Sequence, residues 1–368
     1  MKTPTKLNHQ FGSPDVPTRS LVQPLHLSTI FAMETPSSDD GFQYGRVGNP
    51  TRHALEKTLE EINKAKFCHV FSSGSSALSS LLLTLKKGDK IICHNTGYEG
   101  TFRILQNVFK KLGIIVIFID LENTSVLKEH LKREVTFVVF ETPINPTLHL
   151  LDIEKISSAC HQFGTAVVVD NTFSTSILQQ PLTLGADIVI ESLSKGSNGH
   201  GDIVGGMIIT NNEKFSSQIK NIKETIGIAL SPFECLLVLR GLKTLDIRVL
   251  QQQKTARKIA RFLLSHQEIE KVFFPEISQT PLCRKQMKGP GSLLSFQIKG
   301  DTEKFVQSLQ LITIGHSFGD TETLIQQPAK MMDLTLTIPI NLFRISIGLE
   351  AFTDLKKDLE LALHNSKL

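Results

Sequence analysis

The feature that most constrains the fold of this chain is a series of short, continuously apolar runs separated by amphipathic stretches. The runs are rich in β-branched residues and do not alternate with polar ones, as expected for strands covered on both faces. They lie at 66–71, 90–94, 114–120, 136–141, 165–170, 187–191 and 203–210. The intervening stretches with helical spacing lie at 75–86, 100–112, 125–132, 153–163 and 213–224. Repeated strand–helix–strand units predict an α/β fold with a mostly parallel sheet.

After about residue 230 the pattern changes. A long helical tract is expected over 233–266, followed by a smaller α+β unit. The best strand candidates in this unit are 292–300 and 342–348, and the last helix is expected at 353–364.

This change places a domain boundary near 230–245. It divides the chain into a large domain, 51–240, and a C-terminal domain, 241–368. Residues 1–50 are polar and proline-rich with little periodicity. Such a segment is either disordered or laid against another surface.

Composition excludes several functional classes. With 40% hydrophobic and 21% charged residues among 368, the chain can bury a large core. A net charge of +4 is too small to indicate nucleic-acid binding. The five cysteines lie far apart, which indicates neither a disulfide framework nor a zinc site, and no metal site is expected. The absence of an apolar leader or a long apolar run predicts a cytoplasmic protein with no membrane partner.

The residues that follow the first strand predict an anion site. The run at 66–71 leads into SSGSSA, 72–77, at the start of a helix. The backbone N–H groups of Gly74, Ser75 and Ser76 would be free there, and a helix N-terminus attracts negative charge. A simple serine-rich helix cap is the alternative interpretation.

Two other strand ends bring an acid and an amine to the same edge, because ligands bind beyond the carboxyl ends of parallel strands. Asp170 ends one strand, and Lys195 lies in the Gly/Ser loop after the next, near Ser192 and Ser194. Each alone is common as a turn cap or a solvated side chain. Together, an amine nucleophile, a carboxylate for a pyridinium nitrogen and a phosphate site are what pyridoxal phosphate requires. No dinucleotide fingerprint, Walker A loop or His-Glu-x-x-His motif competes.

Nine collinear strings resemble the pyridoxal-phosphate enzymes of Cys/Met metabolism, the trans-sulfuration family. They are 44–52, 72–77, 97–103, 141–147, 168–173, 181–206, 239–249, 317–329 and 343–350. The match runs from about residue 20 to the end of the chain. The resemblance implies a PLP-dependent transferase fold of type I, aminotransferase-like, with a large mostly parallel-sheet domain and a smaller C-terminal α+β domain.

The resemblance also implies roles around the cofactor ring. Lys195 would hold pyridoxal 5'-phosphate covalently and later move protons. Asp170 would pair with the pyridine nitrogen, and Tyr98 would stack on the ring and help protonate a leaving group. Thr172 and Glu141 would support the site, although Glu141 could equally be a structural partner of a backbone amide.

For the phosphate, the resemblance implies groups from two subunits. The groups from the same chain are Gly74, Ser75, Ser192 and Ser194. Tyr44 and Arg46 would reach the phosphate of a neighbouring subunit, which implies a homotetramer built from dimers with shared active sites. The chain has only two tyrosines, Tyr44 and Tyr98, and both fall where the family uses tyrosine.

For the substrate, the resemblance implies an amino acid whose α-carboxylate is bound by Arg344, a task suited to a planar guanidinium. A surface position or a structural ion pair is the alternative for Arg344. Asn145 would contact the ring hydroxyl or the substrate. Ser317 and Arg103 would complete the substrate site.

The family resemblance predicts γ-elimination or γ-replacement on cystathionine or an O-acyl-homoserine, as in cystathionine γ-synthase and γ-lyase. Gly100 counts against methionine γ-lyase, which has cysteine there. His316 matches neither the γ-enzymes nor the β-lyases and could contact a distal carboxylate. A β-lyase or an O-acetylhomoserine sulfhydrylase is the alternative, and so is a degenerate paralogue that acts as an interaction protein.

The sequence departs from the family pattern at several places near the substrate. Glu99 replaces a usual glycine, Ser75 an apolar residue and Ser194 a threonine. The stretch GSNG follows the lysine at 196–199, and the loop at 331–341 is shortened. These differences indicate a divergent member whose substrate preference does not follow from the resemblance.

Overall fold

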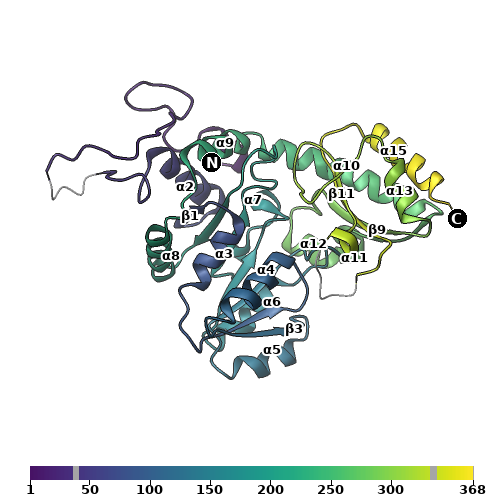
Figure 1. Ribbon diagram of the computed structural model, residues 1–368, viewed down its shortest axis with the longest axis horizontal. Helices are drawn as coiled ribbons and strands as arrows, with labels where there is room; N and C mark the ends of the chain where they lie inside the picture. The colour runs from purple at the N-terminus through teal and green to yellow at the C-terminus, as the bar shows by residue number, and fades with distance from the viewer. Residues whose placement is uncertain (36–40, 332–337, 368) are drawn as a thin grey trace.

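Two separate β-sheets organise the chain (Figure 1). The structure is a computed structural model that describes residues 1–35, 41–331 and 338–367. One sheet has seven strands and lies in the first part of the chain, and the other has five and lies in the C-terminal part. The predicted α/β architecture, with a large mostly parallel sheet and a smaller second unit, is confirmed.

The seven-stranded sheet is parallel except at one strand. Its order is β1 (Phe67–Phe71), β7 (Gly206–Thr210), β6 (Ile188–Ser192), β5 (Ala166–Asp170), β4 (Phe137–Glu141), β2 (Lys90–His94) and β3 (Ile115–Ile119). β7 runs antiparallel to both β1 and β6, and the other pairs are parallel. The run predicted at 203–210 is a strand only from Gly206 onward. At Gly206 the chain passes so close to Ser73 that a Cβ would overlap the Ser73 backbone.

Helices cover both faces of this sheet, which explains why its strands are apolar throughout. Alternate strand residues such as Ile91 and Ile92 enter two different hydrophobic clusters. One face packs against α3 (Gly74–Leu82) and α8 (Glu213–Ile226). The other packs against α2 (Pro50–Asn63), α5 (Thr124–Leu131), α6 (Ile153–His161) and α9 (Pro232–Leu242).

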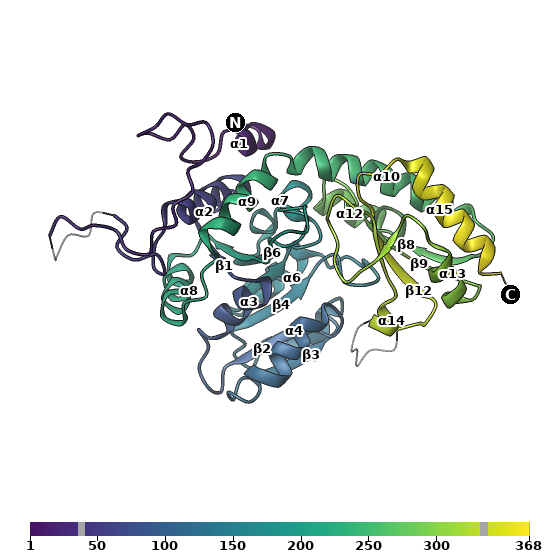
Figure 2. The same cartoon turned by 45° about the horizontal axis from the view of Figure 1, so that its top comes forward.

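The five-stranded sheet has one face covered by helices. Its order is β10 (Thr313–Ile314), β11 (Leu324–Gln326), β12 (Leu342–Ser346), β9 (Leu293–Ile298) and β8 (Ile269–Phe273). Its core includes residues of α10 (Leu245–Ser265), α13 (Thr302–Ser308) and α15 (Phe352–Asn365). The two predicted strands are β9 and β12, and the predicted last helix is α15. Figure 2 shows α10 running along the junction between the two sheet units.

The tract predicted as one helix over 233–266 is two helices, α9 and α10. The break follows Gly241, where a Cβ would overlap the carbonyl oxygen of Asn198, so the chain turns against the loop beyond β6. Similarly, the helix predicted over 100–112 is α4 (Glu99–Ile104) followed by the π-helical turn η1 (Leu105–Phe109). The proposed boundary near 230–245 falls within this α9–α10 region and stays a prediction.

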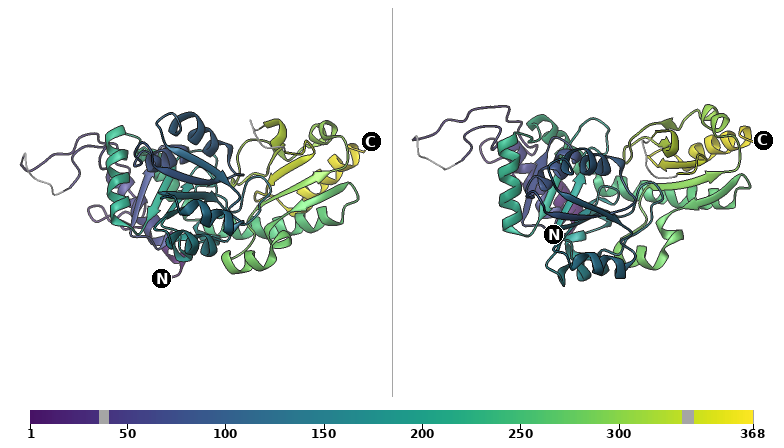
Figure 3. Two further views of the ribbon diagram at one scale, coloured as in Figure 1. Left: turned by 90° about the horizontal axis from the view of Figure 1, so that it is seen from below. Right: turned by 60° about the horizontal axis from the view of Figure 1, so that its bottom comes forward.

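The first ten residues differ from expectation because they fold onto their own chain. They form the short helix α1 (Thr3–Asn8), whose Leu7 is buried in the core beside α2. The side-chain amide of Gln10 donates a 2.6 Å hydrogen bond to the carbonyl oxygen of Leu239. Figure 3 shows part of the described N-terminal segment extending away from the sheet unit, whereas the His26 N–H donates a 3.0 Å hydrogen bond to the Thr51 hydroxyl of α2.

The remaining helical elements are short and were not predicted from periodicity. They are α7 (Thr175–Leu178), η2 (Pro181–Leu184), α11 (Pro275–Ser278), α12 (Thr280–Gln286) and α14 (Pro328–Met331). Within the described ranges, no helix is long and apolar enough to cross a membrane. All five cysteines are buried and unpaired.

Candidate active site

A cavity of about 470 Å³ lies where β4, β5 and β6 end, facing β12 of the smaller sheet. This size is within the range of small-molecule sites. The predicted site residues that line it are Gly74, Ser75, Tyr98, Arg103, Asn145, Asp170, Thr172, Ser192, Ser194, Lys195 and Arg344. The topology thus brings together residues that are up to 270 positions apart (344 − 74).

The start of α3 forms the anion site. The Ser73 hydroxyl accepts a 2.9 Å hydrogen bond from the Ser76 N–H, so Ser76 is part of the helix cap and not a free donor as predicted. The N–H groups of Gly74 and Ser75 have no acceptor in the described part of the chain. A Cβ at Gly74 would lie 3.1 Å from that of Ser192, so glycine permits this close approach.

Asp170 is fixed at the end of β5 by one neighbour. Its Oδ1 accepts hydrogen bonds from the backbone N–H and the hydroxyl of Thr172. The Thr172 oxygen in turn accepts a 2.9 Å bond from the Ser192 N–H. Desolvation raises the pKa of Asp170, and the bonds from Thr172 oppose this shift. The second oxygen, Oδ2, has no partner among the described residues and is available to a cationic ring nitrogen.

Lys195 extends into the cavity from the loop after β6. Its Nζ donates a 2.9 Å hydrogen bond to the Ser317 hydroxyl and lies 5.2 Å from the centre of the Phe318 ring. Desolvation lowers the pKa of Lys195, Asp320 opposes the shift, and Arg344 adds to it. An amine with a lowered pKa is the more reactive nucleophile near neutral pH.

Arg344 comes from the smaller sheet and is almost fully buried. Its Nη1 donates a 2.8 Å hydrogen bond to the side-chain oxygen of Asn145, and its Nη2 donates a 3.3 Å hydrogen bond to the carbonyl oxygen of Ser317. Its Nε is buried without a partner in the described residues, and no ion pair to Arg344 is found there. Burial lowers its pKa to about 10, so it stays cationic. An unpaired buried donor beside a cavity fits a carboxylate.

Comparison with known proteins shows which family of enzymes has this set of residues. The family model described as Cys/Met metabolism PLP-dependent enzyme matches residues 4–364. The chain belongs to this family. It is 38% identical to cystathionine gamma-lyase of Mus musculus over 361 residues, covering 94% of this chain and 91% of that protein. It is 36% identical to cystathionine beta-lyase of Lactococcus lactis subsp. cremoris over 372 residues, 98% of each.

Solved structures agree. The structure of cystathionine gamma synthase from Xanthomonas oryzae pv. oryzae, in complex with aminoacrylate and cysteine, has a TM-score of 0.96 to this chain. It shares 32% sequence identity and covers 100% of this chain and 98% of that one. The family and fold predictions are therefore confirmed, and pyridoxal phosphate is the cofactor of this Cys/Met metabolism enzyme.

The residues present fit this cofactor. The two free N–H groups of Gly74 and Ser75 suit its phosphate, and the unpaired oxygen of Asp170 suits its ring nitrogen. The Lys195 amine lies in the same cavity. The Ser194 hydroxyl exchanges hydrogen bonds of 3.2 Å and 2.9 Å with the backbone of Gly205, and its contact with the phosphate stays a prediction. Within the described residues, no cluster of histidine, cysteine and acidic side chains is arranged to hold a metal ion.

Glu141 supports the loop that carries Tyr98. Its oxygens accept hydrogen bonds from the backbone N–H groups of Tyr98, at 3.1 Å, and Asn145, at 2.5 Å. Burial, together with the nearby charge of Asp170, raises the pKa of Glu141 to about 8. Its observed partners are thus backbone amides, as in the structural alternative. The Tyr98 pKa is also raised, first by desolvation and then by Asp170.

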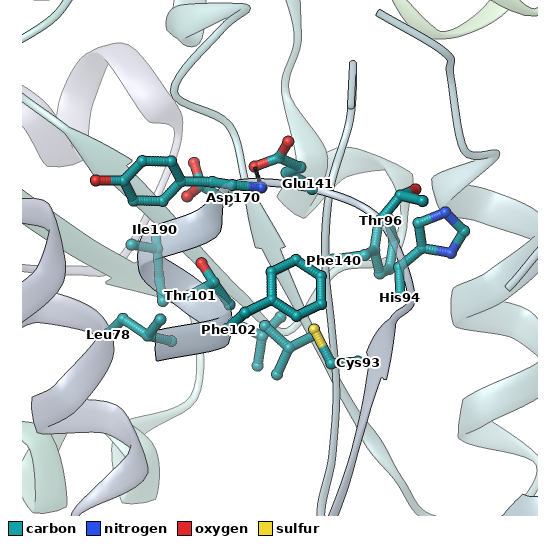
Figure 4. Close-up of a pocket in the computed structure, with 14 residues that line it drawn as sticks. Leu78, Cys93, His94, Thr96, Thr101, Phe102, Phe140, Glu141, Asp170 and Ile190 are labelled. Carbon is teal, nitrogen blue, oxygen red and sulfur yellow. Dashed lines mark hydrogen bonds between the residues drawn. The ribbon is translucent and has the colours of Figure 1, made fainter. Parts of the chain in front are cut away.

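A small chamber of about 30 Å³ adjoins the main cavity beside Tyr98 (Figure 4). Leu78, Cys93 and Phe140 give it apolar walls, Thr101 and Glu141 are among its polar lining residues, and it has room for a water molecule. The Tyr98 ring lies across Gly100, where a Cβ would overlap the ring. In this conformation of Tyr98, the cysteine of methionine γ-lyases would not fit.

The outer rim of the cavity carries Glu99, Arg103 and His316. Glu99 and Arg103 face each other one turn apart on α4 and form an ion pair. The Glu99 side chain is nearly buried, whereas that of Arg103 is 59% exposed. His316 is exposed and comes from the other sheet unit. The predicted shortening of the loop at 331–341 falls largely on 332–337, which lie outside the described residues.

Tyr44 and Arg46 do not line the cavity of their own chain. Both are exposed, and the Arg46 guanidinium lies 5.7 Å from the centre of the Tyr44 ring. Arg46 also donates a hydrogen bond to the carbonyl oxygen of Glu224. Their predicted role at a neighbouring subunit therefore remains a prediction.

Three residues near Lys195 were missed in the sequence. Phe173 and Phe318 stack with ring centres 4.4 Å apart and planes 7° apart, one from each sheet unit. The Arg344 guanidinium lies 5.3 Å from the Phe318 ring. Asp320 is buried beside the same loop. All three lie inside the strings that resemble the family, within three positions of Thr172 or Ser317.

Proposed function

We propose that the protein catalyses γ-elimination or γ-replacement on cystathionine or an O-acyl-homoserine, as a cystathionine γ-lyase or γ-synthase. The observation that carries this proposal is the position of Ser317 between the base and the carboxylate site. Its hydroxyl accepts from Lys195 and its carbonyl oxygen accepts from Arg344. A bound amino acid would thus present its Cα to the Lys195 amine while Arg344 holds its carboxylate.

The cofactor supplies an electron sink that stabilises negative charge on substrate carbon atoms. The chain supplies the rest. Arg344 binds and orients the α-carboxylate, and Asp170 keeps the ring nitrogen protonated. Lys195 removes the proton from Cα and returns protons later in the reaction. Tyr98, which is exposed and lines the cavity, would protonate the departing group.

The outcome depends on which substituent leaves. In γ-chemistry a second proton leaves Cβ and the γ-substituent departs, after which a thiol adds or water completes the cleavage. Cystathionine and water then give cysteine, 2-oxobutyrate and ammonia. In β-chemistry the β-substituent departs directly, and cystathionine gives homocysteine, pyruvate and ammonia.

A β-lyase is the second candidate, because the cystathionine beta-lyase of Lactococcus lactis covers 98% of this chain at 36% identity. An O-acetylhomoserine sulfhydrylase uses the same γ-replacement chemistry with another sulfur donor. The interaction-protein alternative has no support, because the cavity retains Lys195, Asp170, Tyr98 and Arg344 together.

Incubation of the cofactor-loaded protein with L-cystathionine tests the proposal. We expect 2-oxobutyrate and cysteine, identified by chromatography of the keto-acid hydrazones and by thiol analysis. Pyruvate and homocysteine instead would establish β-chemistry and contradict the proposal. If neither keto acid forms, O-acyl-homoserine with cysteine or sulfide is the remaining test of γ-replacement.

Glu99 is expected to affect the choice between acyl donors. Its carboxylate neutralises Arg103 at the rim, so this part of the wall offers little attraction to a donor with a second carboxylate. Replacing Glu99 with glutamine leaves Arg103 unpaired. We expect kcat/KM for O-succinyl-homoserine to rise about fivefold relative to O-acetyl-homoserine, the effect of roughly 1 kcal/mol for an exposed charge pair.

The control for this prediction is Glu129→Gln, which removes the exposed ion pair with Lys132 on α5, away from the cavity. It should leave the ratio of the two donors unchanged. Equal changes for both donors in Glu99→Gln would show that Glu99 does not discriminate between their distal groups.

We also propose that the enzyme is a cytoplasmic homotetramer, a dimer of dimers in which Tyr44 and Arg46 reach the neighbouring phosphate site. Their exposure and distance from their own cavity support this arrangement. Light scattering is expected to give four times the mass of 40.9 kDa. Mixing Lys195→Ala with Arg46→Ala subunits should restore some activity, since one site in the mixed dimer is intact. A fully active monomer would contradict both expectations.

A further inference from the structure

Asp320 is a buried acid next to the lysine loop that no step described above uses. Only 9% of its surface is exposed, and it lies in the loop between β10 and β11. The Gly201 N–H and the Ser317 hydroxyl lie close to its carboxylate and favour its ionised form. Its Oδ1 is buried and has no partner in the described part of the chain. A buried carboxylate with incomplete hydrogen bonding is costly unless it faces a cation.

Among the cations around Asp320, Lys195 has the largest effect on its carboxylate, and Ser317 is bonded to Lys195 and lies close to Asp320. The Lys195 Nζ donates to the Ser317 oxygen at 2.9 Å. A hydroxyl has a single proton to donate, so Ser317, which already accepts from lysine, is free to turn that proton toward the Asp320 carboxylate, whose ionised form it favours. In this orientation the hydroxyl lies between the amine and the carboxylate, and interactions that run from the amine through the hydroxyl to the carboxylate polarise one another.

Backbone contacts hold Lys195, Ser317 and Asp320 in these positions. The Gln252 side chain donates a 2.7 Å hydrogen bond to the Asp320 carbonyl oxygen, and the Gly319 N–H donates a 2.9 Å hydrogen bond to the Ser346 hydroxyl. Gly319 has a φ of +84°, and a Cβ there would lie 2.5 Å from the Gly196 nitrogen. The loop of Asp320 is thus in backbone contact with the loop of Lys195.

We infer that Asp320 positions the Lys195 amine, through the Ser317 hydroxyl, for proton transfer to and from the substrate. The inference rests on the proposed function, because it presumes that Lys195 moves protons. Four charged groups act on each other here: Lys195, Asp320, Arg248 and Arg344. Arg248 donates a 2.9 Å hydrogen bond to the Gly196 carbonyl oxygen. Its positive charge favours the ionised form of Asp320. Arg344 opposes the protonation of Lys195, and Asp320 favours it.

The test replaces Asp320 with asparagine, which keeps the size and removes the charge. Without this charge the Lys195 amine loses its proton more readily. The acidic limb of the kcat–pH profile, which reports the enzyme–substrate complex, should move to lower pH by roughly 1 unit. We expect kcat at its optimum to fall about tenfold because the amine is no longer held, with KM changed less than kcat.

A second readout needs no turnover. Covalent uptake of pyridoxal phosphate by the cofactor-free protein requires the neutral amine and is followed by absorbance. Its pH dependence should move to lower pH by the same amount in Asp320→Asn. Glu322→Gln is the matched control, because it removes an exposed carboxylate two residues away on the same loop. Neither profile should move in that control.

Ser317→Ala gives a further variant in case Asp320→Asn folds poorly. If the hydroxyl connects the two groups, the effect of Ser317→Ala with Asp320→Asn on kcat should be less than the product of the single effects. Multiplicative effects, or an uptake profile identical to that of Glu322→Gln, would overturn the inference. A shifted uptake profile in a protein that turns over no trans-sulfuration substrate would support the inference and reject the proposed function.

Discussion

Replacing Lys195 with alanine is expected to lower kcat by roughly 10³-fold or more, which for practical purposes abolishes turnover. The variant loses at once the covalent attachment of the cofactor and the base that acts at Cα. No other amine is placed to replace it, since Lys195 is the only lysine that lines the cavity in the described part of the chain. The measurement is keto-acid release from L-cystathionine together with the visible absorbance of the loaded protein.

Lys220→Ala is the matched control for this change. Lys220 is an exposed lysine on α8 that pairs with Glu224, and its loss should change neither the absorbance nor the rate. The fold of Lys195→Ala should be retained, because a partly buried amine is removed and only the bond to Ser317 is lost. Normal activity in Lys195→Ala would refute the assignment of the nucleophile.

Replacing Arg344 with lysine is expected to lower kcat/KM by about 10²-fold, corresponding to about 3 kcal/mol for a lost buried charge-assisted pair. Lysine keeps the positive charge but cannot present two parallel donors to a carboxylate. Its single nitrogen also cannot occupy both the Nη1 and the Nη2 positions from which Arg344 bonds Asn145 and Ser317. Most of the loss should appear in KM, because the ground state and the transition state both hold the carboxylate.

The measurement is steady-state kinetics with cystathionine, accompanied by titration of a non-reacting amino acid to report binding directly. Arg257→Lys, an arginine paired with Glu276 away from the cavity, is the control and should behave as the wild type. If Arg344→Lys binds the amino acid as tightly as the wild type, the carboxylate is held elsewhere.

The large sheet could be predicted because its signal is local. Strands buried on both faces need continuous β-branched runs, and each of the seven runs contains one strand. β8 was missed because its sequence, IEKVF, has two exposed charged positions, and β10 because it is only two exposed residues long. The break between α9 and α10 depends on the contact of Gly241 with Asn198, which periodicity does not contain.

The site was predictable to the extent that one sheet edge defines it. Asp170 and Lys195 follow neighbouring strands, so topology alone brings them together. The contacts across the two sheet units were not predictable in this way. The stacking of Phe173 on Phe318 and the bond from Lys195 to Ser317 join residues 122 or more positions apart. Family resemblance placed Ser317 and Arg344, but it gave no reason to select Asp320.

The burial of all five cysteines affects how readily their thiols react with other sulfur compounds. Burial raises the pKa of Cys93 and of Cys160 to about 12 and that of Cys283 to about 11, with upward shifts also at Cys68 and Cys235. Thiolate, the form that exchanges with disulfides, is therefore scarce at neutral pH. In an enzyme of sulfur amino-acid metabolism, these buried and protonated cysteines are therefore expected to form mixed disulfides with substrates or products only slowly while the chain stays folded.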